Sequence, residues 1–179
     1  MPLPPMISYF HKPLMISLEV PDGWARARLP GSALELFGPE VNNYRTNLTI
    51  TTHLMSTTAP ESFEQLIRAS YFSGNLENEL DQLTVMESGE FLLDGYPAFQ
   101  IRLHWVGHND SGANLPLAQL DVLIRVDGET VYEIHAYALQ ALEESEIPVL
   151  EHMVGSIRII PQRAKPPEEK PYQFEISPN

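Results

Sequence analysis

The sequence contains no cysteine, which excludes disulfide bonds, thiolate zinc sites and cysteine nucleophiles. It also has few basic residues, 11 against 24 acidic ones, and a formal net charge of −13. Such a surface repels nucleic-acid backbones and anionic lipid head groups, so we expect no nucleic-acid partner. Acidic residues are dense between Glu61 and Asp94. A basic partner could use that region, although a charged, solubilising surface is the commoner explanation.

Long hydrophobic runs are also missing. No stretch approaches the roughly 18 apolar residues of a membrane span, so we expect no integral membrane segment. The first residues, Met1–Lys12, do not combine a basic region with a long apolar stretch as signal peptides do. With no cysteine for a lipid anchor, the expected location is the cytoplasm.

The familiar catalytic motifs are absent. There is no Gly-x-Ser-x-Gly elbow, no Gly-x-Gly-x-x-Gly, no phosphate-binding loop and no His-Glu-x-x-His. His104 and His108 stand four positions apart, but we place the first on a strand and the second in a loop. Exposed polar residues therefore explain them better than a metal site. We expect neither enzymatic activity nor a cofactor nor a metal.

Proline and charge divide the chain into three parts. Residues 1–13 carry four prolines and predict an extended lead-in. Residues 14–160 predict a single α+β domain, with 43% hydrophobic residues in the whole chain supporting one core. Residues 161–179 carry five more prolines among mixed charges and predict a flexible tail.

Hydrophobic alternation predicts a sheet of strands joined by short turns, which makes it mostly antiparallel. Helical spacing predicts two helices that cover the sheet faces: one from Thr58 to Gly74, and one starting at a Ser145 cap. The expected strands are Leu14–Val20, Ala33–Phe37, Asn47–Met55, two short strands within Leu83–Leu93, Phe99–Trp105, Leu120–Val126, Thr130–Leu139 and a last short one within Ser156–Ile160.

The register of two hairpins predicts a polar row. A three-residue loop, Val126-Asp127-Gly128, would align the apolar faces of its two strands. That register sets His104, Asp121 and Glu133 side by side, on the face opposite Trp105. Three further residues would lie close to this row: Arg102, Arg125 and His135.

Such a row has two interpretations. Two carboxylates and an imidazole could hold a divalent ion or act as acid and base. A solvated sheet face with cross-strand ion pairs is the commoner arrangement, and we favour it. Trp24, after the Pro21-Asp22-Gly23 turn, is similarly either a ligand-facing ring or, as we favour, an anchor at the rim of the core.

The order of these motifs resembles that of PsbP-like domains, a superfamily that includes the DcrB-like proteins. The resemblance rests on Val20-Pro21-Asp22-Gly23-Trp24 after a strand, on Asn47–Thr52, on Ser62–Leu66 at the start of a helix, on Leu93–Ala98 and on Gly128–Tyr132. It covers roughly residues 14–160. It implies an α/β/α sandwich around an antiparallel sheet, and a binding or chaperone module rather than an enzyme.

Three functions therefore remain open. The first is a non-enzymatic protein-binding module, such as a chaperone or adaptor. The second is a small-ligand carrier with a pocket between sheet and helix, lined by Trp24, Phe63 and Trp105. The third, given the least weight, is an enzyme that uses the polar row. Self-association into a homodimer through an exposed sheet edge is a further expectation.

Overall fold

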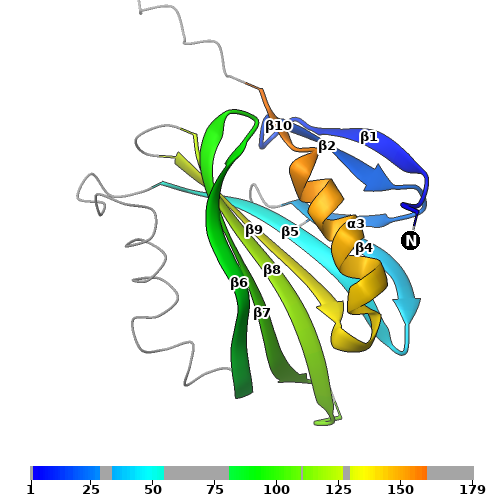
Figure 1. The fold of residues 1–179 in the computed structure, drawn as a ribbon. Coiled ribbons are helices and arrows are strands. Elements are labelled where there is room, and N and C mark those ends of the chain that lie inside the picture. Colours follow the sequence, from blue (N-terminus) through cyan, green and yellow to red (C-terminus); the bar gives the residue numbers. More distant parts are fainter. Residues whose placement is uncertain (1, 29–33, 55–80, 110, 127–129, 161–179) are drawn as a thin grey trace, which may run out of the picture.

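The computed structural model describes residues 2–28, 34–54, 81–109, 111–126 and 130–160. These residues form two antiparallel sheets and one α-helix (Figure 1). The small sheet has the strand order β1-β2-β10, and the large one has the order β3-β4-β5-β9-β8-β7-β6. No helix in this part of the chain is long and apolar enough to cross a membrane.

The strands of the small sheet are β1 (Met6–His11), β2 (Ile16–Pro21) and β10 (Arg158–Ile159). Those of the large sheet are β3 (Ala25–Arg28), β4 (Leu34–Val41), β5 (Tyr44–Leu54), β6 (Asp81–Leu93), β7 (Tyr96–His108), β8 (Asn114–Arg125) and β9 (Thr130–Leu139). A 3₁₀ turn, η1 (Gln140–Leu142), leads from β9 into α3 (Glu143–Gly155).

The main core lies between one face of the large sheet and a layer made of α3 and the small sheet, which both lie on that side (Figure 1). On the sheet, alternate residues of β8 and β9 such as Leu120, Val122 and Ile134 are almost fully buried. The helix contributes Ile147, Val149, Leu150, Met153 and Val154. Alternation with period two on the strands and the apolar stripe of the helix are what the sequence predicted.

A second core lies on the other face of the large sheet. Its buried members are Phe99, Ile101, Leu103, Leu123 and Val131, with Leu83 packed against them. β8 is therefore buried on both faces, from Leu117 to Ile124. A central strand covered on both sides has a nearly continuous apolar run instead of a clean alternation.

The antiparallel α+β fold is confirmed, but the details differ at the N-terminal side. Residues 6–11, expected within the lead-in, form β1 and pair with β2 from Met6–Pro21 to His11–Ile16. The four prolines of the lead-in all lie outside this strand, which is why they do not prevent it. β3 was not predicted.

Two strand predictions need correction. The strand expected to end at Gly38-Pro39 continues to Val41, with a register shift between Phe37 and Glu40. Gly38 lets the strand pass close to Trp24, because a Cβ at this position would lie 3.2 Å from that ring. The two short strands expected in Leu83–Leu93 are one strand, β6, in which Ser88 and Gly89 pair regularly with β7. Its register shifts lie earlier, the nearer of them between Val85 and Glu87.

The C-terminal helix begins earlier than predicted. α3 starts at Glu143, directly after η1, and its N-cap residue Leu142 has no side-chain cap. The Ser145 hydroxyl donates to the Leu142 carbonyl (2.9 Å) and therefore does not cap the helix. Glu143, Glu144 and Glu146 occupy the first turn, where the helix dipole favours acidic groups. The helix predicted for residues 58–74 lies outside the described residues.

Candidate functional site

The predicted row of His104, Asp121 and Glu133 does not form. β7 and β8 pair Ile101 with Asp121, while His104 pairs with Ala118. Directly paired residues share a face, so His104 lies on the α3 side of the sheet and Asp121 on the other. The prediction was wrong because it directed the apolar residues of β7 and β8 to one core, whereas those of β7 build the second core.

Arg102 also lies on the α3 side, where both basic side chains contact the helix. His104 Nε2 is 2.9 Å from Glu143 Oε2. Arg102 lies 3.7 Å from Glu151 on α3 and 3.9 Å from Glu87 on β6. These partly exposed pairs orient α3 on the sheet but stabilise it little individually.

Asp121, Glu133 and His135 do come together. The β8–β9 register pairs Asp121 with His135, and Val122 with Ile134 instead of the predicted Tyr132. The pairing is displaced by two positions, and an even displacement does not turn β9 over relative to β8. The three residues therefore lie on one face, but it is the face of Trp105, contrary to the prediction.

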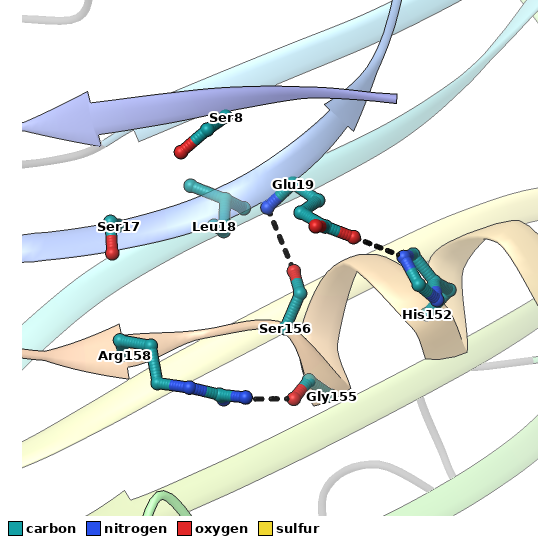
Figure 2. Close-up of a pocket in the computed structure, with 8 residues that line it drawn as sticks. All are labelled: Ser8, Ser17, Leu18, Glu19, His152, Gly155, Ser156 and Arg158. Carbon is teal, nitrogen blue, oxygen red and sulfur yellow. Dashed lines mark hydrogen bonds and ion pairs between the residues drawn. The ribbon is translucent and has the colours of Figure 1, made fainter. Parts of the chain in front are cut away.

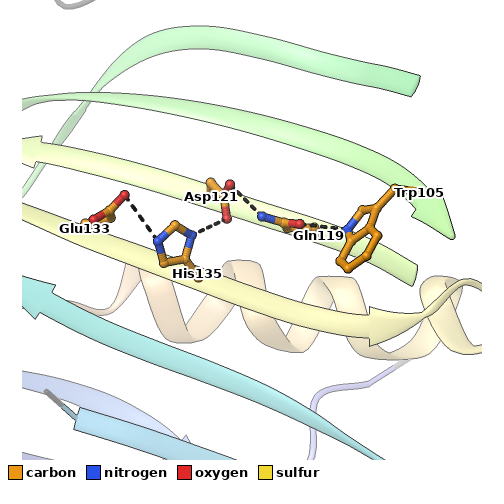
Figure 3. Close-up of polar contacts among 5 residues, drawn as sticks. All are labelled: Trp105, Gln119, Asp121, Glu133 and His135. Carbon is orange, nitrogen blue, oxygen red and sulfur yellow. Dashed lines mark hydrogen bonds and ion pairs between the residues drawn. The ribbon is translucent and has the colours of Figure 1, made fainter. Parts of the chain in front are cut away.

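Together with Gln119 and Trp105 they form a continuous series of hydrogen bonds that we call the Asp121 network (Figure 3). The Trp105 indole N–H donates to Gln119 Oε1 (2.7 Å), and Gln119 Nε2 donates to Asp121 Oδ2 (2.7 Å). Asp121 Oδ1 lies 2.8 Å from His135 Nδ1. His135 Nε2 lies 3.2 Å from Glu133 Oε1.

The centre of the network is a buried ion pair. Asp121 is 1% exposed. Burial alone would lower the pKa of His135, but its hydrogen bonds to Asp121 and Glu133 and the charges of both outweigh burial and raise that pKa to about 10. Tyr137 stacks on His135 with ring centroids 6.5 Å apart. Burial, first of all, raises the pKa of Tyr137, and the Asp121 charge adds to the effect.

This arrangement is better suited to holding a neighbouring side chain in position than to transferring a proton. Both ring nitrogens of His135 are engaged, and a cationic imidazole with a pKa near 10 is a poor base at neutral pH. In the part of the chain that the structure describes, no three acidic or histidine side chains are grouped as metal ligands. What the network does hold in place is the ring of Trp105.

Trp105 also lines a pocket of about 440 Å³ at the end of the sheet, which we call the Trp105 pocket. Leu117 pairs with Trp105, and Asp81 of the edge strand β6 pairs with Val106. The described lining residues are Tyr44, Asp81, Trp105, Val106, Gly107, His108, Leu115 and Leu117. The pocket thus combines the rings of Trp105 and Tyr44, the leucine side chains and one carboxylate.

Gly107 allows this close packing. A Cβ at this position would lie 3.2 Å both from the Trp105 ring and from the Leu117 side chain. From the sequence we expected Trp105 to line a ligand pocket between sheet and helix, but did not identify Tyr44, Gly107 or Asp81 as its neighbours. One feature of the sequence could have indicated the hydrogen-bond network. Gln119 and Asp121 stand within an otherwise apolar run, and polar side chains buried in such a run need hydrogen-bond partners.

Trp24, the remaining predicted site residue, is remote from the Asp121 network in the fold. It is half-buried, packs against the main core and lies against Gly38. This is the position of a rim anchor.

A second, polar depression lies between the end of α3 and the outer face of the small sheet (Figure 2). Glu19, His152 and Ser156 line it, and their residue types are those of a hydrolase triad. However, Ser156 Oγ donates to the Met153 carbonyl (2.7 Å) and accepts from the Glu19 N–H (2.8 Å). The same His152 nitrogen, Nε2, that would serve as base contacts Glu19 (2.6 Å). These contacts join α3 to β2 and do not activate the hydroxyl.

We therefore expect Ser156→Ala to lower the free energy of unfolding by about 0.5–1.5 kcal/mol, because two backbone groups lose a partner that water only partly replaces. Urea denaturation followed by circular dichroism measures this change. Ser17→Ala is the matched control in the same depression, since Ser17 makes no side-chain hydrogen bond within the described residues; its effect should stay within about 0.5 kcal/mol. Equal effects of the two substitutions would contradict this role of Ser156.

No protein-family model and no curated protein matches this sequence. Solved structures do match. The Ran-binding protein Mog1p of Saccharomyces cerevisiae is 14% identical, with a TM-score of 0.58, over 88% of this chain and 97% of Mog1p. Cyanobacterial PsbP from Synechocystis is 9% identical, with a TM-score of 0.59, over 88% and 94%.

A third match is PA94, a protein of unknown function from Pseudomonas aeruginosa. It is 16% identical, with a TM-score of 0.58, over 89% of this chain and 99% of PA94. At these identities the matches establish architecture and not activity. They confirm the resemblance drawn from the sequence motifs: this chain has the PsbP/Mog1-like fold.

Proposed function

We propose that this protein is a non-enzymatic module that binds another protein through the Trp105 pocket. The observation that carries the proposal is the half-buried ring of Trp105, which lines a pocket and is held by its hydrogen bond to Gln119. Tryptophan is enriched among the residues that dominate binding energy at protein interfaces. A ring already held by the Asp121 network loses little further conformational entropy when a partner binds.

The fold supports the same class of function. Mog1p is described as a Ran-binding protein, so this architecture can present a protein-binding surface. The similarity in fold does not make Ran the partner of this protein, because the choice of partner depends on surface side chains and not on the fold. The chaperone or adaptor role implied by the family resemblance is a finer form of the same proposal.

Affinity capture tests it. The immobilised protein should retain a specific partner from a native lysate, and Trp105→Ala should reduce that retention by about tenfold or more, as expected for a binding hot spot. Leu92→Ala is the control, because Leu92 is 71% exposed and lies on β6, opposite Pro97 at the far end of β7 from Trp105. Thermal melting confirms that each variant is folded, and Trp105→Phe keeps an aromatic ring if the alanine variant is unstable. Equal retention by wild type and a folded Trp105 variant would refute the proposal.

A small-ligand carrier is the second candidate, because about 440 Å³ lies within the usual range of ligand pockets. The pocket differs from the one expected between sheet and helix: Trp105 lines it, whereas Trp24 lies elsewhere and Phe63 is outside the described residues. Native mass spectrometry of the purified protein distinguishes the candidates. A co-purified small molecule that Trp105→Ala releases favours the carrier.

A further inference from the structure

We propose that the Trp105 pocket receives the side chain of an arginine from a basic segment of the partner. This inference rests on the proposed function and specifies the chemistry of the contact. The charge, the aromatic rings and the leucine side chains of the pocket lining each favour such a side chain.

The aromatic lining favours a cation. A guanidinium or ammonium group is attracted to the face of an aromatic ring, most strongly to tryptophan. The pocket offers Trp105 and Tyr44. Burial is the main cause that raises the pKa of Tyr44 to about 12, so its hydroxyl stays neutral at physiological pH. The Trp105 ring cannot readily turn away, because Gln119 holds its N–H.

The charge of the pocket favours a cation as well. Asp81 supplies an exposed carboxylate and makes no ion pair within the described residues. No lysine or arginine is among the eight described lining residues. The net charge of −13 adds a long-range field that attracts a basic segment and repels an acidic one.

Shape favours arginine over lysine. The planar guanidinium can stack on a ring and present two N–H donors to one carboxylate, whereas an ammonium is a compact, strongly hydrated point charge. Part of the lining is apolar, with Leu115 and Leu117. Methylene groups of a long basic side chain pack on such a surface while the head group stays polar.

The experiment uses the full-length protein and three peptides: acetyl-Gly-Arg-Arg-Gly-amide, its lysine counterpart and its citrulline counterpart, which is neutral but nearly isosteric with arginine. Titration is followed by the indole N–H signals in ¹H–¹⁵N spectra, and Trp24→Phe assigns the two signals. The arginine peptide should shift the Trp105 signal in a saturable way. The citrulline peptide should not, and the lysine peptide should bind at least about threefold more weakly.

Asp81→Asn should weaken arginine binding by about fivefold or more, because it removes the charged acceptor. Asp22→Asn is the matched control, since it removes the same charge from an exposed turn after β2. Equal losses in the two variants, or equal shifts with arginine and citrulline, would overturn the inference. If Trp105→Ala abolishes capture of the partner while Asp81→Asn and the arginine peptide have no effect, the arginine inference fails and the binding function stands.

Discussion

Asp121→Ala should lower the free energy of unfolding by about 3–5 kcal/mol, the range seen when one member of a buried ion pair is removed. The substitution leaves the partly buried His135 with Glu133 alone and removes the acceptor of Gln119 Nε2. It also leaves a cavity where a carboxylate that is 1% exposed had been. Few single substitutions combine these three effects.

Urea denaturation at pH 7 measures this loss, and Asp22→Ala, in the exposed turn after β2, should change stability by no more than about 0.5 kcal/mol. A double-mutant cycle with His135→Ala then isolates the pairwise part, since residues in direct contact are not additive. A loss below about 1 kcal/mol for Asp121→Ala would show that the ion pair is not central to the fold.

Stability should fall as the pH rises from about 6.5 to 10. In the unfolded chain His135 has its ordinary pKa of 6.5, and in the folded protein the pKa is about 10. The folded state therefore binds the proton more tightly. This stabilisation is fully present below pH 6.5 and is lost as the pH passes through the folded pKa. Over this window the loss should be roughly 3–5 kcal/mol.

Denaturant titrations at steps between pH 6 and pH 10.5 test this dependence. His135→Gln should remove most of this dependence, because it removes the group whose pKa is raised on folding. The His135 ring signals in proton spectra should titrate with a midpoint near 10. A midpoint near 6.5 would contradict the expected pairing with Asp121 and Glu133.

Both experiments also bear on binding. The Asp121 network ends at Trp105, so a variant that breaks it near Asp121 should weaken partner capture even though Asp121 itself is buried. Gln119 is the direct link between them. We therefore expect a folded Gln119→Met variant to retain less partner than wild type, since its Trp105 ring is no longer tethered.

The candidate site was only partly predictable. Of the six predicted residues, Asp121, Glu133 and His135 come together, whereas Arg102 and His104 lie on the other face and Trp24 packs at the main core. Asp81 and Tyr44 are contributed by the edge strand β6 and by the start of β5. Nothing in their local sequence indicates that they line one pocket with Trp105, because only the strand order of the large sheet places them there.

Local patterns determined much of the fold. Alternation along Phe99–Trp105 correctly predicted that Phe99, Ile101 and Leu103 are buried, and the apolar spacing after Ser145 correctly predicted the buried side of α3. Short turns such as Asp94-Gly95 correctly predicted antiparallel neighbours. These properties depend on residues close together in the chain, so the sequence expresses them directly.

The tertiary structure alone decided which layer each face meets. A period of two tells which residues of a strand share a face, but not whether that face packs on α3 or on the second core. On β8, where both faces are apolar, the pattern carries no direction at all. Register shifts in β4 and β6 then set which residues lie opposite each other. Because the pattern of β7 did not show which layer each of its faces meets, His104 was predicted beside Asp121. In the structure the two side chains lie on opposite faces of the large sheet.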